Sequence, residues 1–306
     1  MKIAIIDTGT NSTRLLIAEM KTEGLEELVR LTEVTRLGEG VDGGSRLHSE
    51  AKQRVRKCVD RYAEQIKAKQ VERTIVLATS SVRDASDGEN YLRSLATGHE
   101  FEWKLLTGEE EASLSFSGAV TGVSKNTQVT LFDVGGGSTE VVSGRDDVVE
   151  FAHSLDLGCV RVTERYIKSD PPAQRELDEA RGFIEDLISN EIDLTCVKKA
   201  DRAIAVAGTA TALAAIDLQL ERYERNRVQG HKMSLERVGE ILGGFSGMTE
   251  AQKLKIKTME QGRADVIVAG TMILECLMRY MGAKVVEVSE LDILNGAALA
   301  AMEGRI

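Results

Sequence analysis

The chain has 306 residues, of which 42% are hydrophobic and 29% are charged. This composition is ordinary for a globular protein, and the length is enough for two domains with a core each. The 39 Lys and Arg residues against 49 Asp and Glu residues give a net charge of -10, which argues against nonspecific binding to nucleic acid or to an anionic membrane. A polyanionic substrate would need a local basic patch.

Neither a targeting segment nor a cysteine motif is evident. The first residues, MKIAIID, lead straight into a strand-like segment, and no apolar stretch approaches the roughly 20 residues that span a bilayer. Cys58, Cys159, Cys196 and Cys276 lie far apart without a C-x-x-C pair, so neither a disulfide framework nor a zinc site is predicted. We therefore expect a cytoplasmic protein.

A hairpin motif occurs twice. Residues 3–17, IAIIDTGTNSTRLLI, align without gaps with residues 129–143, VTLFDVGGGSTEVVS, and both segments contain D-x-G-x-x-S-T. In each copy, apolar residues precede the Asp and a second apolar run follows the turn, which is the pattern of two buried strands joined by a hairpin. The separation is far longer than a solenoid repeat, so the motif predicts a duplicated domain.

Predicted strands and helices alternate around the two hairpins. Residues 73–87, RTIVLATSSVRDASD, predict a strand, a turn and a helix start, and residues 202–216 and 284–302 repeat this order. The pattern indicates an α/β fold. A helix from Ser49 is predicted to bury one face, formed by Ala51, Val55, Cys58, Tyr62 and Ile66.

The second hairpin offers ligands for phosphate and for a cation. The glycines at 135–137 let backbone N–H groups approach an anion closely, and Ser138 and Thr139 add hydroxyl donors. Asp133 only accepts hydrogen bonds and would repel a phosphate unless Mg²⁺ lay between them. Strand alternation puts Glu140 on the same face as Ser138, so a second carboxylate is expected at the site.

The first hairpin carries the same set in a weaker form. A single D-x-G turn serves turn geometry alone in many proteins. Two copies in identical register, one in each predicted lobe, favour a phosphate clamp instead. The residues of the first copy are Asp7, Gly9, Asn11, Ser12 and Thr13, with Arg14 following.

Together these segments resemble a known family. DTGTNST and DVGGGSTE are similar to the two phosphate motifs of the actin, Hsp70 and sugar-kinase superfamily, and more closely to those of the exopolyphosphatase and guanosine pentaphosphate phosphatase family. The resemblance covers nearly the whole chain. Further similar segments, in the family's order, are ATSSVRDASD (78–87), LTGEEEASLSFSGAV (106–120), SLDLGCVRVTE (154–164), VAGTATALAA (206–215) and RADVIVAGTMILE (263–275).

The resemblance implies roles for two glutamates. Thr107 and Glu110 by themselves predict a capping box at a helix start. The family's catalytic glutamate stands directly before the alanine of this segment, which is Glu111 here. The resemblance therefore implies that Glu111 orients or deprotonates the attacking water, and that Glu140 acts through metal and water.

Basic and backbone groups are further candidates. Arg83 and Arg14 match the edge of a phosphate, although an ion pair is the alternative for both. Gly208 and Thr209, at a strand-to-helix turn, are candidates for a distal phosphate or a nucleotide. Residues 221–232, ERYERNRVQGHK, are locally basic and either guide polyphosphate or form a solvated helix end.

The chain departs from the family near its end. Many members show S-x-x-G-L-R-E-G, whereas this chain has SELDILNGAAL, with Leu294 and Asn295 at the Arg and Glu positions. We also expect the chain to lack the helical C-terminal domains of the longer members, which help hold long polymers and build the dimer. The departures put a phosphate contact at this segment, and processive action on long chains, in question.

We predict an α/β protein with two ribonuclease H-like (actin-like ATPase) lobes, residues 1–122 with about 291–306 and residues 123–290, and an active site in the interlobe cleft. The predicted reaction is Mg²⁺-dependent hydrolytic release of terminal orthophosphate from inorganic polyphosphate by a homodimer. Alternatives are a guanosine pentaphosphate 5'-phosphatase, a kinase of the same fold, and a non-catalytic polyphosphate or nucleotide sensor. The candidate residues are catalytic Glu111 and Glu140, metal ligands Asp7, Asp133 and Glu140, and phosphate ligands Gly9, Asn11, Ser12, Thr13, Arg83, Gly135, Gly136, Gly137, Ser138, Thr139, Gly208 and Thr209.

Overall fold

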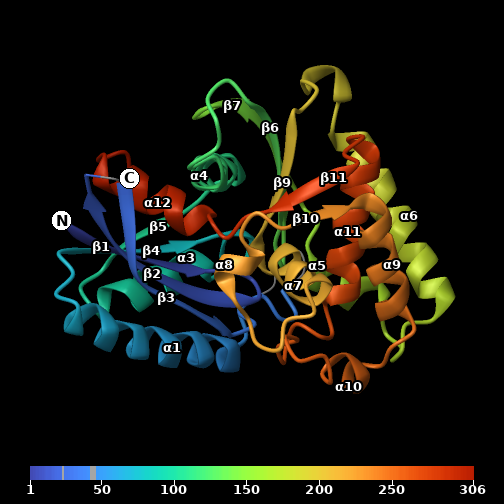
Figure 1. The fold of residues 1–306 in the computed structure, drawn as a ribbon. Helices are drawn as coiled ribbons and strands as arrows, with labels where there is room; N and C mark the ends of the chain where they lie inside the picture. Colours follow the sequence, from blue (N-terminus) through green and yellow to red (C-terminus); the bar gives the residue numbers. More distant parts are fainter. Residues whose placement is uncertain (23, 42–45) are drawn as a thin grey trace. The chain divides into compact units, whose positions relative to one another are not determined.

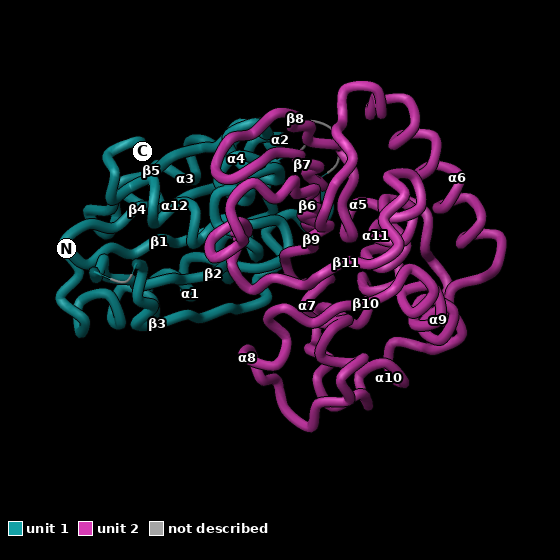
Figure 2. The backbone as a smooth tube through the Cα atoms, turned by 45° about the horizontal axis from the view of Figure 1, so that its top comes forward, with its two compact units in different colours: residues 1–118, 293–306 teal, residues 119–292 magenta. Residues whose placement is uncertain are grey.

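The chain forms two compact units (Figure 2). The structure, a computed structural model, describes residues 1–22, 24–41 and 46–306. Unit 1 contains residues 1–118 and 293–306, and unit 2 contains residues 119–292. The division differs by only a few residues from the lobe boundaries expected at 122 and 291.

Unit 1 is built on a mixed sheet. Over the described residues its strand order is β3-β2-β1-β4-β5, in which β1 pairs antiparallel with β2 and parallel with β4. Its elements are β1 Lys2–Thr8, β2 Ser12–Lys21, β3 Gly24–Val34, α1 Ser49–Ala68, β4 Arg73–Ala78, α2 Ser80–Asp84, α3 Gly88–Thr97, β5 Glu102–Leu105, α4 Gly108–Ala119 and α12 Ile293–Met302.

Helices cover both faces of the unit 1 sheet, with α1 on one side and α12 on the other (Figure 1). Alternate residues of each strand point to opposite faces, so Ala4 and Ile6 pack in the cluster that includes α1. Ile3 and Ile5 pack in the cluster that includes α12. The predicted apolar face of α1 is confirmed, because all five of its residues are buried.

Unit 2 has a six-stranded sheet in the order β10-β11-β9-β6-β7-β8 over the described residues. Here β6 pairs antiparallel with β7 and parallel with β9. Its elements are β6 Gln128–Val134, β7 Thr139–Arg145, β8 Val148–Leu155, α5 Cys159–Tyr166, α6 Gln174–Glu191, the 3₁₀ turn η1 Leu194–Cys196, β9 Arg202–Val206, α7 Ala207–Asp217, α8 Arg225–Val228, β10 Lys232–Ser234, α9 Leu235–Ser246, α10 Glu250–Lys253, α11 Ile267–Tyr280 and β11 Val285–Val288.

The two sheets share one topology. The order β3-β2-β1-β4-β5 of unit 1 returns in unit 2 as β8-β7-β6-β9-β11, and β10 is added at the edge. In both units the duplicated hairpin supplies the first two strands of the sheet. The predicted α/β fold with two ribonuclease H-like lobes is therefore confirmed.

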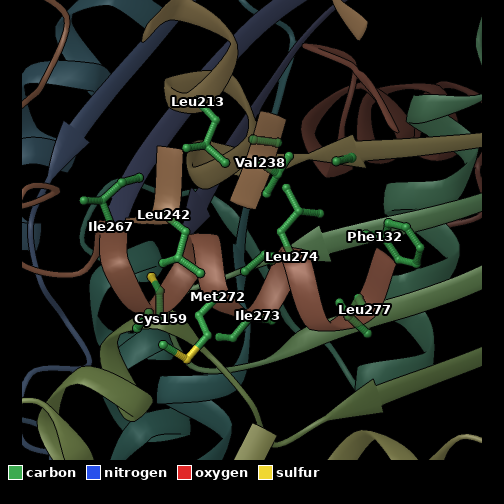
Figure 3. Close-up of a cluster of buried hydrophobic side chains, with 14 of the residues drawn as sticks. Phe132, Cys159, Leu213, Val238, Leu242, Ile267, Met272, Ile273, Leu274 and Leu277 are labelled. Carbon is green, nitrogen blue, oxygen red and sulfur yellow. The ribbon is translucent and has the colours of Figure 1, made fainter. Parts of the chain in front are cut away.

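The core of unit 2 forms around α11, which is buried from Ile267 to Met278 and is mostly apolar, with Thr271 and Glu275 as its buried polar residues. Figure 3 shows side chains from β6, α5, α7 and α9 gathered around this helix. A helix that is apolar over most of its circumference packs inside a core. Among the helices that the structure describes, none combines the length and apolar character needed to cross a membrane.

Candidate active site

The turns of the two hairpins have the same backbone geometry. Gly9 N donates to Ser12 O at 3.0 Å in unit 1, and Gly135 N donates to Ser138 O at 3.0 Å in unit 2. The middle of the turn is Thr-Asn in the first copy and Gly-Gly in the second. The sequence repeat is therefore also a structural repeat at the level of single hydrogen bonds.

In unit 2 the carbonyl groups of the glycine turn are held by α5. Cys159 N donates to Gly135 O at 3.0 Å and Val160 N donates to Gly136 O at 2.9 Å. Arg161 Nε donates to Gly137 O at 3.0 Å. With these carbonyls engaged, the N–H groups at 136 and 137 find no acceptor in the described part of the chain, and such a set of N–H groups suits an anion.

Gly158 makes this arrangement possible. A Cβ atom at this position would lie 2.2 Å from the carbonyl oxygen of Gly136 and 2.4 Å from the nitrogen of Gly137. Only a residue without a side chain lets α5 approach the turn so closely. Burial also raises the pKa of the neighbouring Cys159 thiol to about 11, which disfavours its thiolate form.

Two carboxylates face each other beside the glycine turn. Asp133 and Glu140 are directly paired across β6 and β7, and both are buried. Val141 packs into the core of unit 2, so its neighbour Glu140 lies on the other face of the sheet. Ser154 on β8 donates its hydroxyl to Glu140 Oε1 at 2.7 Å, which orients this carboxylate.

The pair Asp133 and Glu140 fits a divalent cation. Like charges directly opposite each other in a sheet repel, and burial increases the cost. Mg²⁺ is bound through one or two carboxylates and takes its other ligands from water and phosphate. No group of three His, Cys, Asp or Glu side chains suited to a metal occurs within residues 1–22, 24–41 and 46–306. A cation at the second hairpin would therefore be held by two carboxylates of the chain, with water and phosphate as its other ligands.

The threonines of the two motifs have internal partners. Thr13 Oγ1 and Thr35 Oγ1 are 2.8 Å apart, and Thr139 Oγ1 donates to Leu157 O. Both Thr13 and Thr139 are fully buried, because strand alternation turns them away from the face of their motif neighbours. Their hydroxyl groups therefore bond within the hairpins in this structure.

In unit 1 the aspartate of the hairpin is paired with an arginine. Arg14 lies opposite Asp7 across β1 and β2, and its Nη2 and Nε donate to Asp7 Oδ2 at 2.6 and 3.0 Å. Of the two alternatives for Arg14, the ion pair is therefore the one that the structure contains. Asp7 is neutralised within its own unit.

The backbone of the first turn is held by the segment that follows β3. Thr35 N and Arg36 N both donate to Asn11 O, and Gly38 N donates to Thr10 O at 2.9 Å. The carbonyls of this turn are thus engaged, as α5 engages those of the second turn. Gly9, Asn11 and Ser12 remain candidate phosphate ligands on this turn.

Glu110 and Glu111 differ in their surroundings. Thr107 and Glu110 form the predicted capping box, with reciprocal hydrogen bonds of 3.0 and 3.2 Å. Burial acts to raise the pKa of Glu110, but the Lys104 ammonium and Thr107 outweigh it and hold that pKa below its usual value.

Glu111 is buried, and its Oε2 lies 3.4 Å from Nη1 of Arg83. The same Nη1 donates to the carbonyl of Leu106 at 2.9 Å. Arg83 and Glu111 thus lie together in unit 1.

The start of α7 contains Gly208 and Thr209, the candidate ligands for a distal phosphate or a nucleotide. Ala207 has a φ of +67°, in the left-handed region that a residue with a side chain rarely adopts. Backbone strain of this kind gathers at binding sites. Arg263 covers the next residue, because a Cβ on Gly208 would lie 2.0 Å from Arg263 Nη1. Thr209 is buried behind them.

Arg263, Ser154 and Gly158 lie in segments that resemble the family, but the sequence pattern predicts no role for these three residues. A signal for Ser154 was present, since a third strand in register with β7 brings it opposite Glu140. The positions of Arg263 and Gly158 depend on contacts between distant segments.

The chain is similar over nearly its whole length to known exopolyphosphatases and related structures. The chain is 36% identical to exopolyphosphatase 2 of Mycobacterium tuberculosis, over 98% of each chain. The crystal structure of an exopolyphosphatase-like protein superposes with a TM-score of 0.92 at 31% identity over the whole of both chains. That of the Aquifex aeolicus Ppx/GppA family member gives a TM-score of 0.84 at 26% identity, over 100% of this chain and 98% of the other. The chain is thus a phosphoanhydride hydrolase.

A protein-family model also matches most of the chain. The model of the Ppx/GppA phosphatase family matches residues 16–302. The chain belongs to this family.

Proposed function

We propose that the chain is an exopolyphosphatase, which releases orthophosphate from the end of inorganic polyphosphate with the help of Mg²⁺. The observation that carries the proposal is the second hairpin, where open N–H groups at 136 and 137 accompany two buried carboxylates, Asp133 and Glu140. An anion-binding turn beside metal ligands suits metal-dependent phosphoryl transfer to water. The name of the relative from M. tuberculosis supports polyphosphate as the substrate.

The metal is assigned to unit 2. Asp133 and Glu140 would hold Mg²⁺, and when bound it would neutralise charge on the transferred phosphoryl group. Asp7 is the weaker candidate, because its carboxylate is already paired with Arg14.

The residues of the chain supply positioning and a base. We assign to Glu111 the role of orienting the attacking water or accepting its proton, a contribution typically worth about 10²- to 10⁴-fold. Arg83, which is anchored to both Glu111 and the carbonyl of Leu106, holds that carboxylate in place. The N–H groups at 136 and 137 stabilise negative charge on the phosphate oxygens.

The test is a substrate comparison. Purified protein is given polyphosphate, guanosine pentaphosphate or ATP, with Mg²⁺ or with excess chelator, and released orthophosphate is measured. We expect release from polyphosphate that needs Mg²⁺ and no acceptor. Faster release from guanosine pentaphosphate would favour the pentaphosphate phosphatase. Dependence on an acceptor would indicate a kinase, and binding without turnover a sensor.

Location and assembly belong to the same proposal. All four cysteines are free in the structure, which fits a reducing compartment such as the cytoplasm. A homodimer is proposed from the resemblance to the family. Fractionation of the host cell and light scattering of the purified protein test the two points.

A further inference from the structure

Two serines at the start of α2 have buried hydroxyl groups that take no part in the proposed mechanism. Ser80 is 1% exposed and Ser81 is 3% exposed. Both Oγ atoms are shielded from solvent, and neither makes a hydrogen bond to any residue that the structure describes. Because an unsatisfied buried hydroxyl is costly, such a group calls for a ligand or an ordered water.

Ser81 lies beside the turn of the first hairpin. A Cβ atom added to Gly38 would lie 2.3 Å from Thr10 Cγ2 and 2.9 Å from Ser81 Cβ, so the three residues pack together. The topology explains this proximity. β1 and β4 are parallel neighbours with Thr8 opposite Ala78, so the residues that follow each strand leave the sheet at the same edge.

The same short helix leads to the candidate base. Arg83 follows Ser81 by two residues, and its Nη1 lies 3.4 Å from Oε2 of Glu111. Within unit 1, α2 therefore extends from the hairpin turn to Glu111.

The groups that α2 contributes here are hydrogen-bond donors. Serine hydroxyls and an arginine guanidinium suit an acceptor-only ligand, and phosphate presents only acceptor oxygens when ionised. Rotation about χ1 moves a serine hydroxyl between staggered positions, so a hydroxyl that is buried in one rotamer is available in another.

We propose that Ser80 and Ser81 bind the phosphoryl group of the substrate, each donating its hydroxyl hydrogen to a phosphate oxygen. The inference rests on the proposed function and adds two phosphate ligands to it. It also predicts a trade-off. Without substrate the unsatisfied hydroxyls lower the stability of the protein, and with substrate they increase its affinity.

The experiment compares the Ser80→Ala, Ser81→Ala and double variants with the wild type. We expect KM for polyphosphate and the inhibition constant of orthophosphate each to rise about tenfold per hydroxyl, because a hydrogen bond to a charged group is lost. The Tm of the substrate-free protein should stay the same or rise. Ser81→Thr keeps the hydroxyl and should restore binding. The control is Thr74→Ala, which removes a buried hydroxyl near the other end of β4 and should leave both constants unchanged.

Two results would overturn the proposal. One is a double variant whose KM and inhibition constant stay within about twofold of wild type. The other is a lowered Tm with unchanged binding, which would show that the hydroxyls bond to structural water. If the wild type releases no orthophosphate, the proposed function fails by itself. Titration calorimetry with tripolyphosphate then decides on the serines, since weaker binding by the double variant supports them and equal binding refutes them.

Discussion

Asp7 lies opposite Arg14 across the first hairpin, with 2.6 Å between Asp7 Oδ2 and Arg14 Nη2. The equivalent positions of the second hairpin hold Asp133 and Glu140. One copy of the motif thus neutralises its aspartate within the chain, whereas the other places two buried carboxylates side by side, where like charges repel. The two copies therefore differ in the residue that faces the aspartate, and this difference is the reason that we assign the proposed Mg²⁺ to the second copy.

This inequality predicts different metal dependence for two matched variants. Asp133→Asn should raise the Mg²⁺ concentration for half-maximal activity about tenfold or more, because a charged ligand is lost. Asp7→Asn should lower kcat but keep the metal midpoint within about twofold. Titration of activity with Mg²⁺ measures both midpoints. Equal shifts in the two variants would mean that Asp7 is a metal ligand after all.

Glu111→Gln should lower kcat by about 10²- to 10⁴-fold with little change in KM, because glutamine keeps the shape of the side chain but cannot accept the proton of the water. Steady-state kinetics and binding of polyphosphate are measured on the same preparation. The control is Glu110→Gln, one residue earlier on α4. It should cost little, since glutamine also serves in a capping box. If both variants lose activity equally, the base has been assigned to the wrong carboxylate, and Glu140 becomes the candidate.

Ser154→Ala should lower kcat about tenfold and raise the Mg²⁺ midpoint, because Glu140 loses the hydroxyl that orients it. The shift in the metal midpoint separates a positioning role from a structural one. Ser143→Ala is the matched control. Ser143 is a buried serine on β7 whose hydroxyl bonds to Gln128 at 3.2 Å. An unchanged metal midpoint in Ser154→Ala would argue against the role.

Gly158→Ala should weaken phosphate binding and lower the Tm, because the new methyl group overlaps the carbonyl of Gly136. Orthophosphate inhibition and thermal unfolding report the two effects. Gly182→Ala, in the middle of α6 with open space around its Cβ position, is the control. That change should raise stability by about 0.5–1 kcal/mol. Wild-type phosphate affinity in Gly158→Ala would show that α5 does not shape the turn.

Glu275→Gln should destabilise the protein in a pH-dependent way. Burial disfavours the charge of Glu275, but hydrogen bonds from Arg181 and Arg279 outweigh it and lower its pKa below the usual 4.5. A lowered pKa contributes stability that is present above the unfolded value and is lost as pH falls through the folded value.

Urea unfolding at pH 7 and below pH 4 measures this difference. At pH 7 the loss should be about 1–3 kcal/mol, and it should shrink in acid. Glu179→Gln, which removes an exposed pair with Arg175, should change the free energy of unfolding by less than about 0.5 kcal/mol at either pH. A pH-independent loss in Glu275→Gln would point to packing instead of charge.

The architecture was predictable where a local pattern determines it. The apolar runs around Asp7 and Asp133 identified both hairpins, and the spacing of Thr107 and Glu110 identified the capping box. Alternation also separates the two faces of a strand, and it could have shown that Thr13 and Thr139 face inward.

Other features depend on segments far apart in the chain. Whether Arg14 binds phosphate or Asp7 was open in the sequence, because both partners satisfy a guanidinium. The strained backbone of Ala207 and the position of Arg263 over Gly208 follow from packing between α7 and the segment before α11. Asn295 is similar. It accepts from Arg30 at 3.0 Å and donates to Glu27 at 2.8 Å, so the departure from the family pattern at this position has a structural role in unit 1.

The placement of α12 in unit 1 bears on how the protein is made. Residues Ile293 and Ala297 pack in one cluster with Ile3 and Leu16, so one face of the amino-terminal sheet lacks part of its cover until the ribosome has released residue 302. Unit 2 is a continuous stretch and is free to fold during translation. Unit 1 has to wait with one apolar face only partly covered, and chaperones that bind nascent chains should protect that face. A tag or truncation at α12 would therefore act on the amino-terminal unit.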